Sequence, residues 1–371
     1  MNEDYGILLI RLNREKKKYI ARRYLQFELA IPKSMQILRL NPMNFPRNVE
    51  EKIRRHYVNI LKMTREDEKA NARKFKQESK RLGQVITKTF LKTIIEKFDI
   101  DLDSEKNIAI ALDEETVKIP WELGFINDMP IRFCDKCNVG RLRIVEHESW
   151  HVPTMSRSPR IGDRALVVGI NYIGSPTKAK RLKYAEEEAA KIKVILENYF
   201  KVTLLRGEEA TKDRILKELQ KGVKVFHFTG HGGITKDKSG ILAFDGELTT
   251  QEFDESLEIT DTPAPCLSFM NACETSTEFS TVTDVEWKSY SWAFMMADCG
   301  GRAFIGTFWP INDCPETASF SCNFYKEFFD KEKPIAKALQ KVRKALVSRD
   351  ETNGYAYVLY GPPTLKKRDI I

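Results

Sequence analysis

The 371-residue sequence contains no uninterrupted apolar run as long as a membrane-spanning helix needs, which is about 18 residues. Its first residues, Met1-Asn-Glu-Asp-Tyr5, are acidic and lack the basic and apolar regions of a signal peptide. It has seven cysteines, an odd number, which favours reduced thiols over a set of disulfides. These absences predict a cytoplasmic protein that does not enter a membrane.

The sequence also lacks a tetratricopeptide-like repeat and any nucleic-acid-binding motif. The net charge of +8 is unevenly spread, since residues 1–100 carry 24 Lys and Arg against 12 Asp and Glu. That stretch is therefore +12 and the remainder −4. A basic region can attract nucleic acid or an acidic partner, but a solvated Lys-rich surface is the simpler interpretation. We do not expect direct nucleic-acid binding.

Apolar patterning predicts strands and helices that alternate along the second half of the chain. The expected strands cover residues 5–12, 19–29 (after a charged turn at 13–18), 107–112, 164–170, 202–205 and 302–308. The expected helices cover residues 49–63, 82–98, 182–200, 211–220, 287–298, 315–329 and 335–347. Residues 64–81 are expected to form an exposed helix or a loop, and residues 151–161 a linker. The alternation predicts an α/β fold with a mostly parallel sheet.

Two further apolar runs each end in a reactive residue. Residues 225–233 read Val-Phe-His-Phe-Thr-Gly-His-Gly-Gly, and residues 265–275 read Pro-Cys-Leu-Ser-Phe-Met-Asn-Ala-Cys-Glu-Thr. Short apolar runs of this kind are typical of buried parallel strands. Because ligands bind beyond the carboxyl ends of such strands, we expect His231 and Cys273 to emerge at one edge of the sheet.

A thiol beside an imidazole can act as a nucleophile with its base. The thiolate is the nucleophilic form, and an imidazole favours it by taking the proton or by pairing with it as imidazolium. The backbone N–H groups of Gly232 and Cys273 are expected to stabilise the oxyanion of an acyl-transfer intermediate. For His227, four residues before His231, we expect a hydrogen-bonded position inside the sheet. The alternative, non-catalytic interpretation of Cys273 is a buried structural thiol.

The order of these motifs resembles caspase-like peptidases, in which the His precedes the Cys by about 50 residues. Here the spacing is 42 residues, and Asn271 stands where caspases have Gln. The sequence more closely resembles the CHAT family, caspase-like peptidases related to separase. The resemblance rests on residues 119–123 (Ile-Pro-Trp-Glu-Leu), 182–189, 227–232, 271–275, 306–313, 324–325 and 355–361, which occur in the family's order.

The resemblance implies a caspase-haemoglobinase fold in two parts. Residues 1–155 would form a degenerate, non-catalytic caspase-like half, and residues 156–371 the catalytic peptidase domain. It implies a cysteine endopeptidase that cleaves a protein substrate and needs no metal or organic cofactor. The competing hypothesis is a catalytically silent caspase-fold module that only docks partners.

The resemblance also implies control by another protein. Members of the family act in prokaryotic defence, in cell-death pathways and in CRISPR-linked protease complexes, and many carry repeats that this chain lacks. A separate activating or sensor partner is therefore expected. Residues 64–81 and 275–286 are polar segments that such a partner could order.

Asp313 is a candidate for substrate recognition. Its position, 40 residues after Cys273, matches an Asp that lies in the S1 pocket of separase-like relatives, where it would pair with a basic P1 side chain. The alternative role is an N-cap for the helix that Cys314-Pro315 opens. Asp245 and Glu274 are further acids that could reach such a pocket.

Four residues have the types that hold zinc: Cys134, Cys137, His147 and His151. The spacing between the cysteine pair and the histidine pair is shorter than in zinc fingers. We therefore expect reduced thiols and unrelated histidines at these positions, and no metal.

Overall fold

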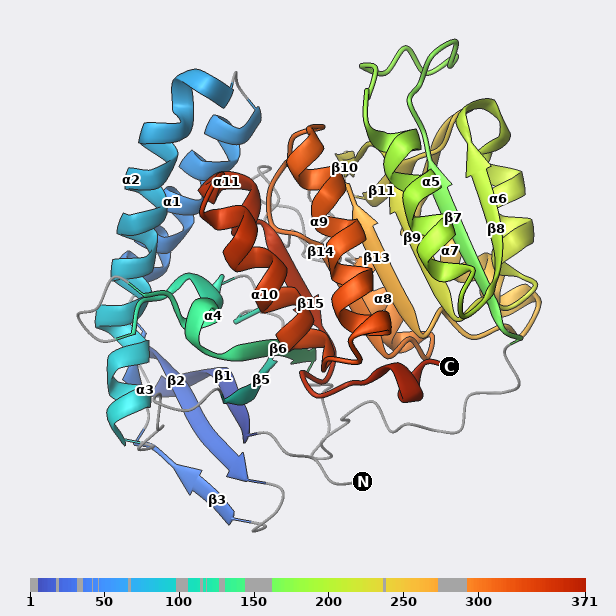
Figure 1. The fold of residues 1–371 in the computed structure, drawn as a ribbon. Helices are drawn as coiled ribbons and strands as arrows, with labels where there is room; N and C mark the ends of the chain where they lie inside the picture. The colour runs from blue at the N-terminus through green and yellow to red at the C-terminus, as the bar shows by residue number, and fades with distance from the viewer. Residues whose placement is uncertain are drawn as a thin grey trace. The chain divides into compact units, whose positions relative to one another are not determined.

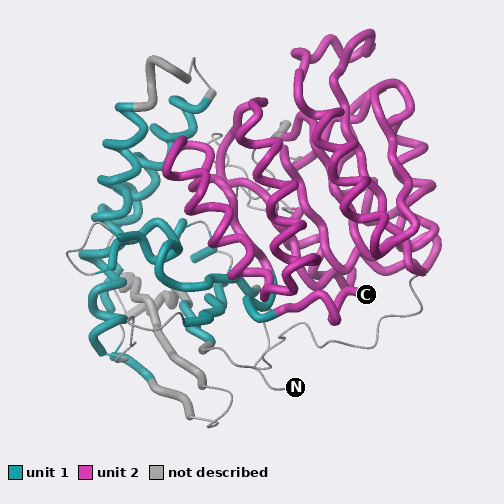
Figure 2. Tube along the Cα trace, in the orientation of Figure 1, with its two compact units in different colours: residues 1–152, 361–364 teal, residues 153–360, 365–371 magenta. Residues whose placement is uncertain are grey.

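The computed structural model describes residues 6–17, 20–31, 36–41, 43–45, 47–65, 68–97, 106–113, 116–117, 119–126, 131–143, 162–235, 238–272 and 292–371. The chain divides into two compact units, shown in different colours in Figure 2. Unit 1 comprises residues 1–152 and 361–364, and unit 2 comprises residues 153–360 and 365–371. That the first part is a non-catalytic caspase-like half stays a prediction.

Unit 1 combines strands with a long helical segment. Its described strands are β1 (Gly6–Lys17), β2 (Ile20–Ile31), β3 (Gln36–Arg39), β4 (Met43–Asn44), β5 (Asn107–Leu112) and β6 (Asn138–Arg143). Its described helices are α1 (Arg47–Arg65), α2 (Glu68–Ile86), the π-helical turn η1 (Thr87–Leu91), α3 (Lys92–Lys97), the 3₁₀ turn η2 (Trp121–Leu123) and α4 (Phe133–Lys136).

The predicted N-terminal hairpin is present, but its strands are longer than expected. β1 and β2 pair antiparallel up to Lys17 opposite Ile20, so residues 13–17, predicted as a charged turn, continue β1. Charged side chains do not interrupt the backbone hydrogen bonds that define a ladder. β5 lies parallel to β1 on one side and to β6 on the other.

The polar segment 64–81 is mostly helix, which agrees with the first of its two predicted alternatives. α2 is anchored through apolar positions on one face, because Phe75, Leu82 and Ile86 are all buried. Their spacing of seven and four residues keeps them on one side of a helix. A few buried apolar positions on one face therefore hold this mostly polar segment as a helix.

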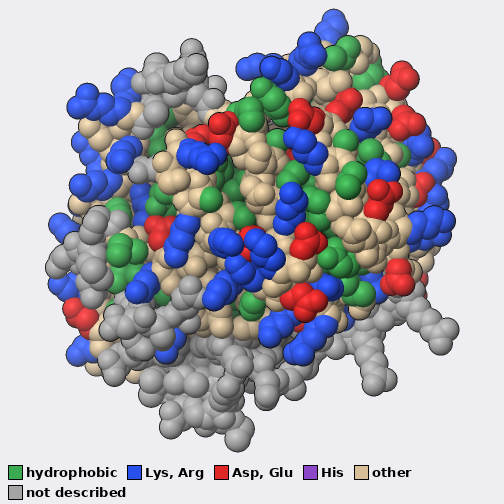
Figure 3. All heavy atoms as spheres, in the orientation of Figure 1, with side chains coloured by type: hydrophobic (Ala, Val, Ile, Leu, Met, Phe, Trp, Pro, Cys, Tyr) green, Lys and Arg blue, Asp and Glu red, His purple; other side chains and the backbone are tan. Residues whose placement is uncertain are grey.

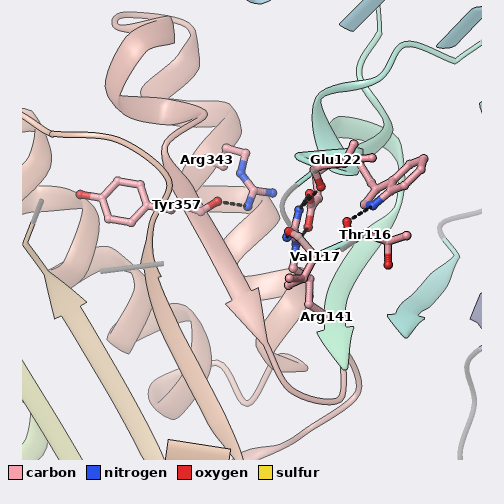
Figure 4. Close-up of polar contacts among 8 residues, drawn as sticks. Thr116, Val117, Glu122, Arg141, Arg343 and Tyr357 are labelled. Atoms are coloured by element: carbon pink, nitrogen blue, oxygen red, sulfur yellow. Dashed lines mark hydrogen bonds and ion pairs between the residues drawn. The ribbon is translucent and has the colours of Figure 1, made fainter. Parts of the chain in front are cut away.

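The Pro-Trp-Glu-Leu segment forms a buried polar centre in unit 1 (Figure 4). The Glu122 carboxylate pairs with the Arg141 guanidinium through two 2.6 Å contacts. Arg141 also donates to the carbonyls of Val117 and Ile119, and it is 1 % exposed. Breaking such a pair leaves an uncompensated buried charge and costs about 3–5 kcal/mol. The motif is therefore structural in this unit.

Unit 2 carries most of the alternating strands and helices. Its described strands are β7 (Arg164–Gly169), β8 (Lys201–Arg206), β9 (Val225–Thr229), β10 (Gly232–Thr235), β11 (Lys238–Leu242), β12 (Glu247–Thr249), β13 (Leu267–Asn271), β14 (Ala303–Thr307) and β15 (Tyr357–Tyr360). Its described helices are α5 (Ala185–Leu196), η3 (Gly207–Glu209), α6 (Lys212–Leu219), α7 (Thr250–Ile259), α8 (Trp292–Asp298), α9 (Pro315–Tyr325), η4 (Lys326–Asp330), α10 (Ile335–Val347), α11 (Glu351–Gly354) and η5 (Lys367–Asp369).

The main sheet of unit 2 has the strand order β8-β7-β9-β13-β14-β15. The first five strands run parallel, and β15 runs antiparallel to β14. α5, α9 and α10 cover one face, where they share an apolar core with the sheet, and α7 and α8 lie on the other face (Figure 1). This arrangement confirms the predicted mostly parallel α/β sheet flanked by helices.

Unit 2 also contains strands and helices that were not predicted, including β10–β12, α7, α11 and β15. β10, β11 and β12 form a small antiparallel sheet, and α7 follows it directly. The start of α7 carries a capping box, in which Thr249 and Glu252 satisfy each other's backbone N–H groups. The Thr-x-x-Glu spacing was a usable signal for this helix.

Lys and Arg side chains gather over α10 and η4 (Figure 3), where Glu327 accepts from Lys331, Lys333 and Lys341. Burial raises the pKa of Glu327, but the three lysine hydrogen bonds outweigh it and lower the pKa to about 2. The carboxylate therefore stabilises the fold above its unfolded pKa of 4.5, and this contribution is lost as the pH falls toward 2.

We expect Glu327→Gln to destabilise the protein at neutral pH by on the order of 2 kcal/mol and to have little effect near pH 2. Thermal denaturation of both proteins across this pH range checks the expectation. Glu187→Gln is the matched control, because Glu187 forms only an exposed ion pair with Lys191. An equal loss of stability at both ends of the range would contradict the assigned role.

Candidate active site

The carboxyl ends of β9 and β13 define the site. These strands are adjacent and parallel, and Thr229 lies opposite Asn271 at their last paired position. His231 and Cys273 each follow two residues later. Cys273 lies outside the described residues, so its pairing with His231 stays a prediction. The chain leading to it is held in place, because the Thr307 hydroxyl donates to the Ala272 carbonyl at 2.7 Å.

His231 is half-buried, and its ring is oriented by a backbone carbonyl. Nε2 lies 2.6 Å from the carbonyl oxygen of Lys180. Because a carbonyl oxygen only accepts, Nε2 carries the proton of the neutral ring, and Nδ1 keeps its lone pair. The ring can therefore take up a proton at Nδ1, which is the property a general base requires.

Tyr172, which follows β7, fixes the backbone of His231. Its hydroxyl accepts from the His231 N–H at 2.9 Å and donates to the Leu242 carbonyl at 2.5 Å. The Tyr172 and His231 rings pack with their centroids 4.7 Å apart. A Cβ on Gly230 would approach the Tyr172 hydroxyl to 2.8 Å, which explains the glycine before His231. Tyr172 itself has a φ of 60°, a conformation that is rare outside glycine and concentrates at functional sites.

Gly232 begins β10 and lies opposite Ile241. It follows His231 immediately, at the same edge of the main sheet as the end of β9. The second predicted oxyanion donor, the N–H of Cys273, lies outside the described residues. The oxyanion role of this pair of N–H groups is therefore still a prediction.

Asp313 is exposed, and its carboxylate accepts from the backbone N–H groups of Lys183 and Tyr184, just before α5. The alternative interpretation, an N-cap for α9, is wrong, because Cys314 occupies that position and forms the capping box with Thr317. Asp313 thus connects the segment after β14 to the start of α5. Lys180, which orients His231, lies three residues before Lys183.

The other candidate acids differ in position. Asp245 is exposed and accepts from the Lys212 N–H at 2.8 Å, at the start of α6. Glu274 lies outside the described residues. His227 is fully buried, and its Nδ1 lies 3.3 Å from the Tyr325 hydroxyl, as expected for an interior position.

The zinc-type residues are only partly described. Cys134 and Cys137 lie in and just after α4 and are buried, whereas His147 and His151 lie outside the described residues. Burial raises the pKa of Cys137 to about 12, which disfavours the thiolate that zinc requires. Within the described part of the chain, no cluster of metal-ligating side chains occurs.

Several solved structures have a similar fold. The Saccharomyces cerevisiae separase–securin complex superposes with a TM-score of 0.61 at 12 % identity, over 97 % of this chain and 30 % of separase. The Arg-specific cysteine proteinase gingipain R superposes with a TM-score of 0.53 at 13 % sequence identity, over 76 % of this chain and 68 % of the gingipain chain. A complex of the pro- and mature domains of Porphyromonas gingivalis RgpB superposes with a TM-score of 0.52 at 13 % sequence identity, over 86 % of this chain and 78 % of the RgpB chain.

These likenesses and the sheet topology define a caspase-like peptidase fold. The CHAT-domain family model matches residues 80–369, and the chain belongs to this family. Both results confirm the predicted fold class and family. Among curated proteins, none matches the chain. No helix in the described ranges has the length and apolar character needed to span a bilayer.

Proposed function

We propose that this protein is a cysteine endopeptidase that uses His231 and Cys273 as a catalytic dyad. The observation that carries the proposal is the parallel register of β9 and β13, which end at one edge with Thr229 opposite Asn271. The orientation of His231 supports it further, because the Lys180 carbonyl leaves Nδ1 available as a proton acceptor.

In this mechanism Nδ1 of His231 takes the thiol proton, and the Cys273 sulfur attacks the scissile carbonyl. The backbone N–H groups of Gly232 and Cys273 stabilise the oxyanion. The tetrahedral intermediate collapses as the amine leaves with a proton from His231, and a water molecule then hydrolyses the acyl-enzyme. These steps need no metal or organic cofactor.

We further propose that the enzyme cleaves after Arg or Lys, with Asp313 at the base of the S1 pocket. Asp313 is exposed, and its carboxylate accepts from the N–H of Lys183. Lys183 lies three residues after Lys180, whose carbonyl contacts His231. A carboxylate uses two oxygens with about four lone-pair sites, so its bonds to Lys183 and Tyr184 leave capacity for a substrate guanidinium. One of the similar structures is described as Arg-specific, which agrees with a basic P1 side chain.

Control by a partner protein is part of the proposal, and so is a defence, CRISPR-linked or cell-death setting, by analogy with other members of the family. Two of the similar structures are complexes, one with securin and one with a pro-domain. Residues 275–286, predicted to be ordered by a partner, lie outside the described residues.

Mapping of new protein N-termini by mass spectrometry tests the proposal without a known substrate. Cell lysate treated with the wild-type protein should gain N-termini that follow Arg or Lys, and lysate treated with Cys273→Ala should gain none. The assay is run with and without candidate partner proteins. Identical N-termini for both proteins under every condition would favour the catalytically silent docking module instead.

A further inference from the structure

A buried carboxylate on α5 connects the ends of the two strands that carry His231 and Cys273. Glu188 is 2 % exposed. Its two oxygens accept from Nδ2 of Asn271 at 2.9 and 2.8 Å, and one of them also accepts from the Thr229 hydroxyl at 3.2 Å. Thr229 and Asn271 are the paired last residues of β9 and β13. One side chain therefore holds both strand ends, two residues before each member of the dyad.

The other side of Asn271 is fixed as well. Its Oδ1 accepts from the Tyr357 hydroxyl at 2.7 Å, so the amide has only one orientation that satisfies both partners. The backbone carbonyl of Tyr357 accepts from the Arg343 guanidinium of α10 at 2.8 Å. The Tyr357 ring points away from Arg343 (Figure 4). The ring also stacks on Phe320 with centroids 3.8 Å apart. Asn271 is thus held between α5 and β15.

His227 completes the surroundings of the carboxylate. Its Nε2 lies 3.3 Å from Oε1 of Glu188, close enough for electrostatic contact, although this nitrogen makes no hydrogen bond of good geometry. The Thr229 hydroxyl and the Asn271 amide both donate to Glu188, and this suits an acceptor-only group, which is the ionised carboxylate. A charge kept inside the sheet interface is costly unless it is fully bonded, so the bonds to Asn271 and Thr229 are tightly specified.

The helix that carries Glu188 cannot shift easily. A Cβ on Gly169 of β7 would lie 2.5 Å from the Ala189 Cβ and 2.8 Å from the Ala185 carbonyl, so α5 packs directly on the backbone of β7. At its start, Asp313 accepts from the N–H groups of Lys183 and Tyr184. The position of the Glu188 carboxylate is therefore set by the fold and not by its partners.

We propose that Glu188 is a positioning residue that sets the separation of His231 and Cys273 by locking the ends of β9 and β13 to each other. The inference rests on the proposed dyad. Catalysis depends on reacting groups held to within a fraction of an ångström, and a rigid strand end two residues away supplies that precision. Loss of the hydrogen bonds from Thr229 and Asn271 to Glu188 lowers the rate of the chemical step more than it weakens substrate binding.

Glu188→Gln tests this role with minimal change of shape. Its amide nitrogen would face Nδ2 of Asn271, placing two donors together. We expect kcat for an Arg-peptide to fall at least tenfold, with KM within about twofold. The double variant Glu188→Gln with Asn271→Asp reverses donor and acceptor, so it should recover most of the lost kcat. Asn271→Asp alone places two carboxylates together and should lower kcat as much as Glu188→Gln does. Glu187→Gln, on the exposed face of α5, should behave as wild type.

A second measurement separates this inference from the proposed function. The rate of Cys273 alkylation by iodoacetamide, followed by peptide mass spectrometry, reports on the dyad without turnover. Glu188→Gln should slow it at neutral pH, and the double variant should restore it. If the wild type cleaves no peptide but shows this pattern, the positioning role stands and the peptidase function fails. A wild-type alkylation rate and kcat in Glu188→Gln, or no recovery in the double variant, would overturn the positioning role.

Discussion

Replacing Cys273 or His231 with Ala is expected to abolish peptide cleavage while leaving the fold intact. In a cooperating nucleophile and base, loss of either member removes nearly the whole effect, on the order of 10⁴-fold or more in kcat. The fold should survive because His231 is only half-buried and its backbone bond to Tyr172 does not involve the imidazole. Steady-state cleavage of an Arg-containing peptide measures the effect, and thermal denaturation measures the fold.

The control for this pair is His227→Gln, which changes a buried imidazole that the mechanism does not use. It should reduce stability but retain cleavage above the level of the two Ala variants. Turnover close to wild type in Cys273→Ala or His231→Ala would contradict the dyad. A His227→Gln variant that folds yet is as inactive as they are would contradict the assignment of His231 as the only imidazole that cleavage requires.

Substrate preference should be the second large effect. We expect kcat/KM for peptides with Arg or Lys at P1 to exceed that for apolar or acidic residues by roughly a hundredfold. A charge-assisted carboxylate–guanidinium contact is worth about 3 kcal/mol once the bound substrate covers the exposed Asp313 carboxylate. Asp313→Asn should remove most of this preference while leaving a carbonyl oxygen for the Lys183 and Tyr184 N–H groups. A P1 peptide library measures both proteins.

Asp245→Asn is the matched control for Asp313, since Asp245 is also exposed and also accepts a backbone N–H at the start of a helix. It should leave the P1 profile unchanged. An apolar or acidic preference in the wild type would remove the S1 assignment. A loss of preference in Asp245→Asn, with none in Asp313→Asn, would transfer the assignment to Asp245.

The part of the fold that depends on local pattern could be predicted from the sequence. β9 and β13 are short apolar runs with abrupt polar ends, so both their existence and their shared edge follow from strand periodicity and parallel pairing. The start of α6 was also predicted, since the expected helix began at Thr211, whose side chain caps α6 by accepting from the Arg214 N–H. Strand limits were less accurate, because the ladder of β1 continues through charged residues.

The parts that depend on distant contacts could not be predicted. Asp313 contacts residues about 130 positions earlier in the chain, and no local pattern indicates which helix it would meet. Tyr172 was missed although it follows a strand at the same edge. Glu188 left a readable signal, because it lies on the buried face of α5 with Ala185, Ala189 and Ile192. An acid at an apolar helix position requires a specific partner, but the identity of that partner is tertiary information.

The most direct test of the account is covalent labelling with a peptide acyloxymethyl ketone that carries Arg at P1. Two of the other cysteines are poor competitors, because burial raises the pKa of Cys137 and Cys322 to about 12. The account predicts a single adduct, mapped to Cys273 by peptide mass spectrometry, that is absent in His231→Ala and weak when Asp replaces Arg in the probe. An adduct on another cysteine, or labelling of Cys273 that does not depend on His231, would contradict the proposed dyad.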